Sequence, residues 1–449
     1  MMLTSEQAKD RAADLVARAM KSGADACDVV YSADAATQVQ MRLGALEDVE
    51  RSEGEEISLR VFVGKQSASA SSSDLSVEAL ATLAERAVAM AREAPEDAFA
   101  GLAPEDLLMR DAPPDLGLDD GGDVAPAALR ERARAAEDAA RAVSGVTNSE
   151  GAGSSASRAV VALATSHGFA GSYTGSSHGL SASVLAGEGG NMQRDYAYHT
   201  ARHESDLDDA EAIGRSAGER AVARLNPLKL KSGPMPVIFD PRVGNSLLGH
   251  LAGAINGASI ARKTSFLLEK LHKQIFPAGI TIIDDPLRAR GLRSRPFDGE
   301  GLATHRTAIV EKGVLGGWLV ESASGRQLGL APTGHATRGG GGAPGAGTSN
   351  LHMEAGTATP EELMADIETG FYVTELIGMG VNGLTGDYSR GASGFLISKG
   401  EIAGAVAEVT IAGNLNEMFA NLAPANDLEF RYATNVPTLR IDGMMLAGD

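Results

Sequence analysis

Residues 27–63 read CDVVYSADAATQVQMRLGALEDVERSEGEEISLRVFV, and short apolar or alternating runs recur in this stretch between small polar residues and glycines. Such runs are typical of strands, and Gly44, Gly54 and Gly64 are typical of the turns between them. The expected strands are Cys27–Ala33, Thr37–Leu43, Leu46–Ser52 and Ile57–Val63. The stretch therefore predicts an antiparallel meander.

Helical patterns flank this meander. A helix over about 5–20 begins with Thr4 and Gln7, which fit a capping box. Further helices are expected over 76–93, 125–143 and 207–225, and further strands over 157–165, 179–185 and 192–200. Two sheet layers with covering helices would account for this half of the chain.

A break rich in proline, Asn226–Pro234, is the best candidate for a domain boundary. It predicts an N-terminal domain over 1–230, whose two subregions are joined by an acidic connector near 95–123, and a C-terminal domain over 231–449. Beyond the break, buried strands are expected over 235–239 and 279–283, around a long helical pattern over 243–271, and later strand-like runs alternate with glycine turns. The expected fold class is α+β, with an N-terminal helix-and-antiparallel-sheet domain followed by a β-rich C-terminal domain.

The charge balance excludes some classes of partner. The 449 residues include 40 Lys and Arg against 59 Asp and Glu, a formal net charge of -19, and no Lys/Arg run stands out. This charge disfavours direct binding to nucleic acid or to an anionic membrane. The start of the chain lacks a signal-peptide pattern, and no segment approaches the roughly 18 apolar residues of a membrane span. We expect a cytoplasmic protein.

Two short motifs point to chemistry but also have simpler explanations. Gly175–Gly179 matches G-x-S-x-G with Ser177 at the nucleophile position, yet residues 180–185 alternate like another strand instead of a helix. On a helix, His199 and His203 could share a metal, whereas along a strand they would lie roughly 13 Å apart. The alternation of the preceding residues favours the strand. A serine hydrolase and an unorthodox metal site remain alternatives, and the role of the segment from His199 to His203 stays open.

The loosest stretch of the chain is Arg338–Gly347, which contains four consecutive glycines. It formally satisfies G-x-G-x-x-G, but no strand leads into it and Pro344 lies inside it, unlike a dinucleotide site. A flexible loop is the simpler interpretation, yet exposed backbone there could also pair with an extended peptide. The candidate peptide-binding residues are Arg338, Gly339, Gly340, Gly341, Gly342 and Asn350.

Longer phrases resemble the TldD/PmbA family over essentially the whole chain. In the C-terminal half they are RPFDGEG (295–301), NLHMEAG (350–356) and GLTGDYSRGASG (383–394). The phrases VTIAGNL (409–415) and NDLE (426–429) resemble the TldE/PmbA branch in particular. The phrase QRDY (193–196) extends the resemblance into the N-terminal half. These phrases are far more specific than the short motifs.

The resemblance has a consequence for metal binding. In the protease branch, TldD, zinc is held by an HExxxH helix and a cysteine late in the chain, and the glutamate is the catalytic base. The corresponding stretch here, LLGHLAGA (247–254), places Gly249 and Ala254 at the two histidine positions and His250 at the glutamate. The one cysteine, Cys27, lies at the far end of the chain in a strand-like stretch, which favours a buried, inert thiol. The resemblance thus implies no catalytic residue and no metal ligand in this chain, with zinc in a partner subunit.

The resemblance also implies a complex with a TldD-like protease subunit. Paired subunits would enclose a chamber that admits unfolded peptides, and this chain would be a scaffold or a substrate-guiding subunit. Family members carry the older name "modulator of DNA gyrase", and the acidic charge argues that any effect on gyrase is indirect. Two alternatives stay open: an autonomous hydrolase or peptidase, using Ser177 or an unorthodox metal site, and a homodimeric peptide-binding protein without proteolysis.

Overall fold

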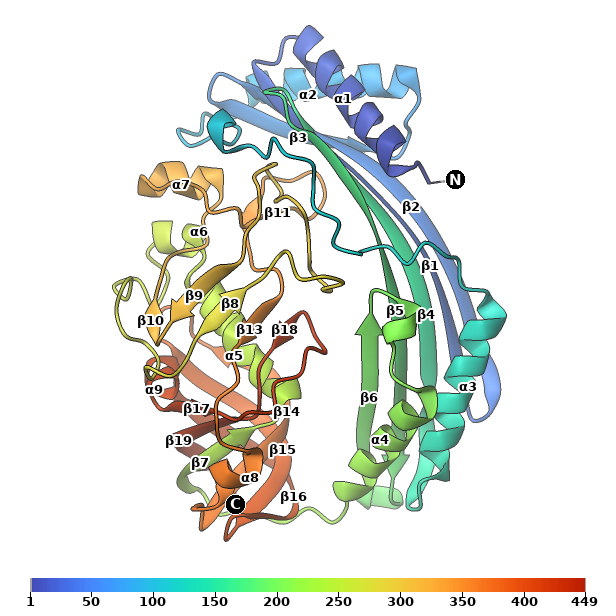
Figure 1. The fold of residues 1–449 in the computed structure, drawn as a ribbon, viewed down its shortest axis with the longest axis vertical. Coiled ribbons are helices and arrows are strands. Elements are labelled where there is room, and N and C mark those ends of the chain that lie inside the picture. The colour runs from blue at the N-terminus through green and yellow to red at the C-terminus, as the bar shows by residue number, and fades with distance from the viewer. Residues whose placement is uncertain (1, 449) are drawn as a thin grey trace.

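A six-stranded antiparallel sheet dominates the first half of the chain. The computed structural model describes residues 2–448, and in Figure 1 this sheet curves around one side of the second half. Its strands follow the order β3-β2-β1-β4-β5-β6. They are β1 (Ala26–Arg42), β2 (Ala45–Val63), β3 (Gln66–Ser72), β4 (Val146–Thr165), β5 (Ala170–Ala186) and β6 (Gln193–Ala201).

Two long strands, β1 and β2, replace the four short ones that were expected over residues 27–63. They pair without a break from Ala26–Phe62 to Gln40–Asp48, and Gly54 lies inside β2 opposite Asp34. The turn expected at Gly44 is confirmed, since Leu43 and Gly44 have φ angles of 51° and 79°, the positive values that a two-residue type I′ hairpin requires. The expectation of four strands was wrong because a glycine inside a strand weakens the pairing without ending it.

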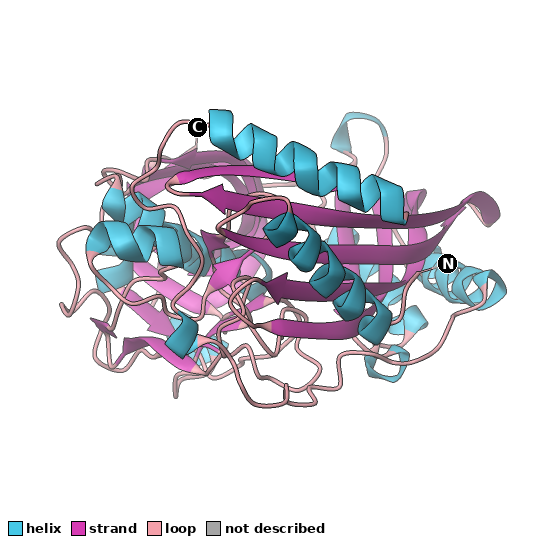
Figure 2. Ribbon diagram, turned by 90° about the horizontal axis from the view of Figure 1, so that it is seen from above, coloured by secondary structure: helices cyan, strands magenta, loops and turns pink. Residues whose placement is uncertain are grey.

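Four helices cover the outer face of this sheet, as Figures 1 and 2 show. They are α1 (Ser5–Lys21), α2 (Val77–Glu93), α3 (Pro126–Ala142) and α4 (Ala210–Ala223), close to the four predicted helices. The expected capping box of Thr4 and Gln7 is present. Side chains such as Leu15 of α1, Tyr31 of β1 and Leu59 of β2 form the core between helices and sheet. The helices thus leave the inner face of the sheet to the second half of the chain.

The second half is built around a six-stranded sheet that closes through an additional strand pairing. The main sheet has the order β16-β15-β14-β7-β19-β17, and β16 also pairs with β19. These strands are β7 (Gly233–Phe239), β14 (Thr369–Val381), β15 (Asp387–Ser398), β16 (Glu401–Asn414), β17 (Leu422–Pro424) and β19 (Leu439–Ala447). The α+β fold class predicted from the sequence is confirmed.

Shorter strands and helices complete this half. A five-stranded sheet consists of β8 (Ile282–Asp284), β9 (Thr307–Glu311), β10 (Val314–Leu315), β13 (Leu351–Met353) and β18 (Thr434–Asn435), and β11 (Ala336–Thr337) pairs with β12 (Gly345–Ala346). The helices are α5 (Pro241–Ala254), α6 (Gly257–Ala261), α7 (Ser322–Leu328), α8 (Pro360–Met364) and α9 (Leu415–Ala420). Helix α5 buries Leu247, Leu248 and Leu251 in the large core of this half.

The long helix expected over 243–271 is not formed. Helix α5 ends at Ala254, and the Asn256 side chain accepts the N–H of Ala258 as the cap of α6. The Gly257 N–H then donates to the Leu319 carbonyl, so the backbone leaves helical geometry to contact a distant segment. A helical hydrophobic pattern does not reveal this, because asparagine at a cap stops one helix and starts the next.

The connector between α2 and α3 runs between the two halves (Figure 1). Its Leu118 carbonyl accepts the N–H of Ser176 at the edge of β5. From the other half, the guanidinium of Arg326 donates to three carbonyls of the connector, those of Phe99, Gly101 and Leu102. The connector therefore fastens the curved sheet to the second half.

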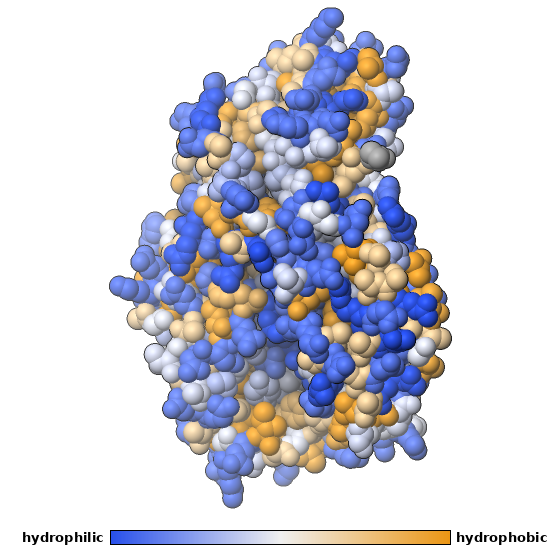
Figure 3. Space-filling view, turned by 45° about the vertical axis from the view of Figure 1, so that its right-hand side comes forward, coloured by the Kyte–Doolittle hydropathy of each residue, from blue (hydrophilic) through white to orange (hydrophobic). Residues whose placement is uncertain are grey.

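The surface seen in Figure 3 is mainly hydrophilic, with apolar residues in small scattered patches. Within residues 2–448, every helix is too short or too polar to cross a lipid bilayer.

Candidate functional site

A pocket of about 410 Å³ lies where the inner face of the curved sheet meets loops of the second half. The sheet contributes Val30 and Ser32 of β1, Val161 and Leu163 of β4, and Tyr173 of β5; the loops contribute residues between 293 and 299 and between 337 and 348. Successive side chains of a strand alternate between faces, so Val30 faces the pocket while its neighbour Tyr31 packs under the helices. We call this site the inter-sheet pocket.

Arg338, one of the predicted residues, connects the loops to the sheet. Its side chain is 6% exposed, and its guanidinium lies 2.6 Å from the carboxylate of Asp28 in β1. The same carboxylate accepts a hydrogen bond from Nε of Arg60 at 3.0 Å. Burial alone would raise the pKa of Asp28, but Arg60 and Arg338 outweigh it and hold that pKa below its usual range. One buried carboxylate is thus shared by two arginines from opposite sides of the interface.

The glycine-rich loop over residues 338–347 packs against the curved sheet. Strands β11 and β12 close it into a hairpin. A Cβ atom on Gly341 would lie 2.7 Å from the Cβ of Ser58 in β2, so the close approach requires glycine at this position. Gly340 lines the inter-sheet pocket, whereas Gly339 and Gly342 are exposed and a Cβ there would meet nothing. The predicted glycines therefore have three different surroundings.

Asn350 lies behind the inter-sheet pocket, on a second pocket of about 270 Å³. It is 2% exposed. Its side-chain oxygen accepts the Arg293 N–H at 2.9 Å, and its side-chain nitrogen donates to Asp285 O at 2.7 Å and to Ser294 Oγ at 2.8 Å. Because these bonds engage its amide, Asn350 holds the loop that carries Arg293 and Ser294 in place. The geometry gives it a positioning role, and direct contact of Asn350 with a peptide stays a prediction.

Two buried acids lie beside the pocket in the RPFDGEG phrase. The Asp298 carboxylate accepts backbone N–H groups from Glu300, Leu302 and Ala336, and burial raises its pKa. Glu300 accepts the N–H and the hydroxyl of Ser322. Burial, followed by the neighbouring Asp298 charge, raises the pKa of Glu300 to about 7. Through these hydrogen bonds, the two acids hold in place the turn that forms one wall of the pocket.

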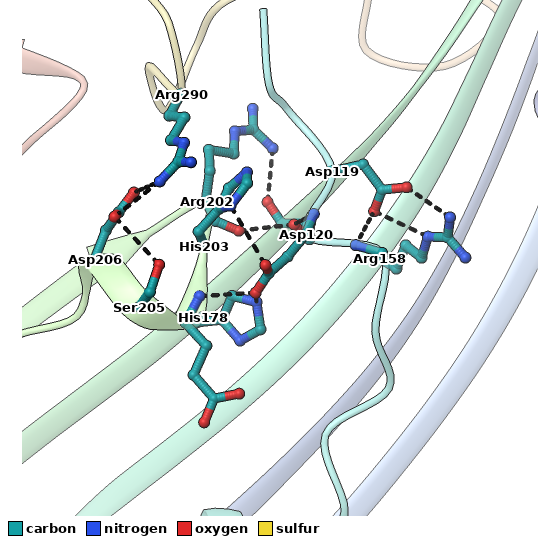
Figure 4. A network of polar contacts seen from close by, with 12 residues as sticks. Asp119, Asp120, Arg158, His178, Arg202, His203, Ser205, Asp206 and Arg290 are labelled. Carbon is teal, nitrogen blue, oxygen red and sulfur yellow. Dashed lines mark hydrogen bonds and ion pairs between the residues drawn. The ribbon is translucent and has the colours of Figure 1, made fainter.

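Ser177 lies in the middle of β5, opposite Ser157 of β4, without the sharp strand-to-helix turn of a nucleophile elbow. The next residue, His178, points to the other face of the sheet. There Asp120 of the connector lies between His178 and His203, at 3.1 Å and 3.3 Å (Figure 4). Ser177 is therefore separated by the sheet from the Asp120–His178 pair, and this geometry does not fit a catalytic triad.

The predicted strand around His199 is confirmed, since β6 ends at Ala201. The Nδ1 of His199 lies 3.2 Å from Asp208 Oδ1, and the Nε2 of His203 lies 2.8 Å from Gly117 O. Each histidine thus has a partner of its own. Across residues 2–448, no three His, Cys, Asp or Glu side chains gather in a group able to hold a metal ion.

Helix α5 carries the stretch that was aligned with the zinc helix of the protease branch. Gly249 is exposed and a Cβ there would meet nothing, whereas Ala254 is buried. The His250 ring packs edge-on against Tyr388, with 6.0 Å between ring centroids. Burial, together with the charge of Arg390, lowers the pKa of His250. Cys27 belongs to the core of the other half, and burial raises the pKa of its thiol to about 12.

Sequence reasoning missed several residues of the inter-sheet pocket, above all Arg202, Arg293, Arg295 and Phe297. A signal was present, since the stretch RARGLRSR over 288–295 holds four arginines in eight residues. These arginines alternate with uncharged residues and do not form a continuous run, so they were overlooked.

Comparisons with known proteins agree with this architecture. Three family models match: PmbA/TldA metallopeptidase domain 1 over residues 27–91, the central domain over 119–225 and the C-terminal domain over 232–448. The protein "Metalloprotease PmbA" of Escherichia coli O157:H7 is 39% identical over 426 residues, which cover 94% of this chain and 92% of that protein.

Two solved structures share the whole fold. A protein of Bacteroides thetaiotaomicron described as a modulator of DNA gyrase superimposes with a TM-score of 0.92 at 28% identity, covering 100% of both chains. TldE from Thermococcus kodakarensis superimposes with a TM-score of 0.88 at 22% identity, covering 98% of this chain and 100% of that one. This chain therefore belongs to the PmbA/TldD family, in the branch of the proteins named PmbA or TldE.

Proposed function

We propose that this chain is the non-catalytic, substrate-guiding subunit of a two-subunit zinc metalloprotease that cleaves unfolded or flexible peptides in the cytoplasm. The observation that carries the proposal is the composition of helix α5. By the resemblance to the protease branch, Gly249 and Ala254 correspond to the two histidines of the HExxxH motif, and neither has a side chain that can bind a metal.

The surroundings of α5 support the same conclusion. His250 packs on Tyr388, and Cys27, the one thiol of the chain, is buried in the other half. A hydrolytic zinc site needs three protein ligands and an open position for water. Catalysis in the complex would then depend on zinc held by the partner subunit.

The inter-sheet pocket supports a guiding role. Binding sites for small ligands and peptide segments are concave, mostly apolar and equipped with a few polar groups that fix orientation. Val30, Leu163 and Phe297 supply apolar surface, and Arg293 and Arg295 supply hydrogen-bond donors. A flexible segment can enter such a site, whereas a folded domain cannot.

The assembly predicted by this proposal is testable by native mass spectrometry. The purified chain is mixed with a TldD-like protease subunit, and the masses of the free and mixed samples are compared. We expect a complex that contains both chains and replaces any homodimer seen in the free sample. A homodimer that persists unchanged in the mixture would favour the alternative, a homodimeric peptide-binding protein without proteolysis.

A further inference from the structure

Three arginines with unused hydrogen-bond donors line the inter-sheet pocket. Among residues 2–448, the exposed Arg293 side chain has no hydrogen-bond or ion-pair partner. Arg295 makes a single long bond, 3.3 Å to Gly347 O, and its buried Nε has no partner. The Arg338 side chain is 6% exposed and is paired with Asp28, yet its Nε also lacks a hydrogen-bond partner. Buried donors without partners are rare in folded proteins and call for an acceptor.

The pocket has an excess of positive charge in a protein whose net charge is -19. Four arginines line it, whereas Asp298 is its one carboxylate among the described residues. The oxygens of Asp298 are engaged by three backbone N–H groups, and burial raises its pKa. The carboxylate of Asp28 is shared with Arg60. Asp28 Oδ1 has no hydrogen-bond partner, and Arg295 acts on Asp298 through its charge. Among the described residues, neither acid forms an ion pair with Arg293 or Arg295.

The remaining wall of the pocket is apolar. Val30, Val161 and Leu163 project from the sheet, and Phe297 lies opposite with its ring edge-on to Tyr173, 5.5 Å between centroids. The volume of about 410 Å³ lies in the range of roughly 300–1,000 Å³ that is typical of ligand pockets. The site therefore suits a ligand that joins an anionic group to an apolar body.

We propose that the inter-sheet pocket binds a carboxylate carried by a peptide, with the carboxylate against Arg293, Arg295 and Arg338 and an adjoining apolar side chain against Val30 and Phe297. The planar guanidinium matches a carboxylate through two parallel hydrogen bonds, and such charge-assisted bonds are the strong ones. The carboxylate comes either from the peptide C-terminus or from an Asp or Glu side chain. This inference deepens the proposed function, on which its identification of the ligand as a peptide rests.

The experiment uses the isolated full chain, so it needs neither a partner subunit nor catalysis. Fluorescence anisotropy measures the binding of a hexapeptide, Ser-Gly-Ser-Ala-Leu-Phe, that carries an uncharged dye at its N-terminus. The free-acid peptide is compared with its C-terminal amide, and with an amide in which Glu replaces the alanine. The amide without Glu should bind at least about tenfold more weakly than the peptide whose carboxylate is recognised, which is the free acid or the Glu-containing amide, because that is the loss expected for a charge-assisted bond. Recovery of affinity by the Glu-containing amide assigns the site to an acidic side chain, and continued weakness assigns it to the C-terminus.

Arg293→Gln is the decisive variant, because this exposed side chain makes no hydrogen bond or ion pair within residues 2–448. We expect it to reduce the affinity for the peptide whose carboxylate is recognised about tenfold and to leave the affinity for the amide without Glu unchanged. Arg306→Gln is the matched control, since Arg306 is exposed and lies outside the pocket, 3.6 Å from Glu354. Equal binding of the free acid, its amide and the Glu-containing amide, wild-type affinity of Arg293→Gln for the peptide whose carboxylate is recognised, or no binding of any of these peptides would overturn the proposal.

The binding result and the subunit result can fail separately. If the chain binds a carboxylate-bearing peptide but forms no complex with a TldD-like subunit, the carboxylate site is supported and the proposed function is contradicted. A chain that forms the complex but binds all three peptides equally supports the proposed function and contradicts the carboxylate site.

Discussion

Glu300 provides a quantitative test of the packing around the inter-sheet pocket. Burial raises the pKa of this carboxyl to about 7 in the folded protein, against 4.5 for its ordinary value. Between these two pH values the folded state binds a proton that the unfolded chain has released. The free energy of unfolding must therefore fall as the pH rises from about 4.5 to about 7. A shift from 4.5 to about 7 corresponds to a loss on the order of 3 kcal/mol.

The variant Glu300→Gln should abolish this loss, because the amide oxygen still accepts the bonds from Ser322 but carries no titrating proton. Urea unfolding at pH 5 and pH 8 measures the effect, with the fluorescence of the one tryptophan, Trp318, which is 8% exposed, as the signal. The difference in unfolding free energy between the two pH values should be larger in the wild type than in the variant. The exposed Glu311→Gln serves as the control and should follow the wild type. Parallel pH profiles for the wild type and Glu300→Gln would refute the reasoning.

Three further outcomes follow from individual contacts. Asp28→Asn removes the carboxylate shared by two buried arginines and should lower the unfolding free energy at pH 7 by about 3–5 kcal/mol in urea titrations. The matched control Glu53→Gln lies in an exposed arginine pair and should change the unfolding free energy little. Equal effects of the two variants would contradict the importance of burial. Gly341→Val should displace the glycine-rich loop and speed its cleavage by trypsin, and Gly342→Val, where a Cβ meets nothing, should not. Ser177→Ala should leave any peptidase activity of the mixed subunits unchanged, and loss of that activity would revive the serine-hydrolase alternative.

Much of the fold could be predicted from local sequence signals. The capping box at Thr4, the helical spacing of the four N-terminal helices and the alternation in β6 were interpreted correctly, because each depends on neighbouring residues. The pairing of β1 with β2 over seventeen positions was missed, since sheet register depends on contacts with distant strands. The end of α5 at Ala254 was missed because the hydrophobic pattern does not reveal the Asn256 cap, and because the contact of Gly257 with Leu319 is distant in sequence.

The site was predictable only in part. Arg338 and Gly340, two of the candidate residues, line the inter-sheet pocket, although their use in peptide binding stays a prediction. The sequence could not show that Val30, Tyr173 and Arg293 meet there, because they come from three segments brought together by the packing of the two halves. A phrase such as RPFDGEG identifies a family but does not reveal that its arginine faces a pocket.

The central claim is that this chain guides substrates for a zinc-bearing partner. The most direct test measures cleavage of an unfolded protein substrate and the zinc content for this chain alone, for a TldD-like subunit alone and for their mixture. We expect the isolated chain to be inactive and without stoichiometric zinc, and the mixture to cleave the substrate faster than the TldD-like subunit alone. Stoichiometric zinc together with peptidase activity in the isolated chain would contradict the account.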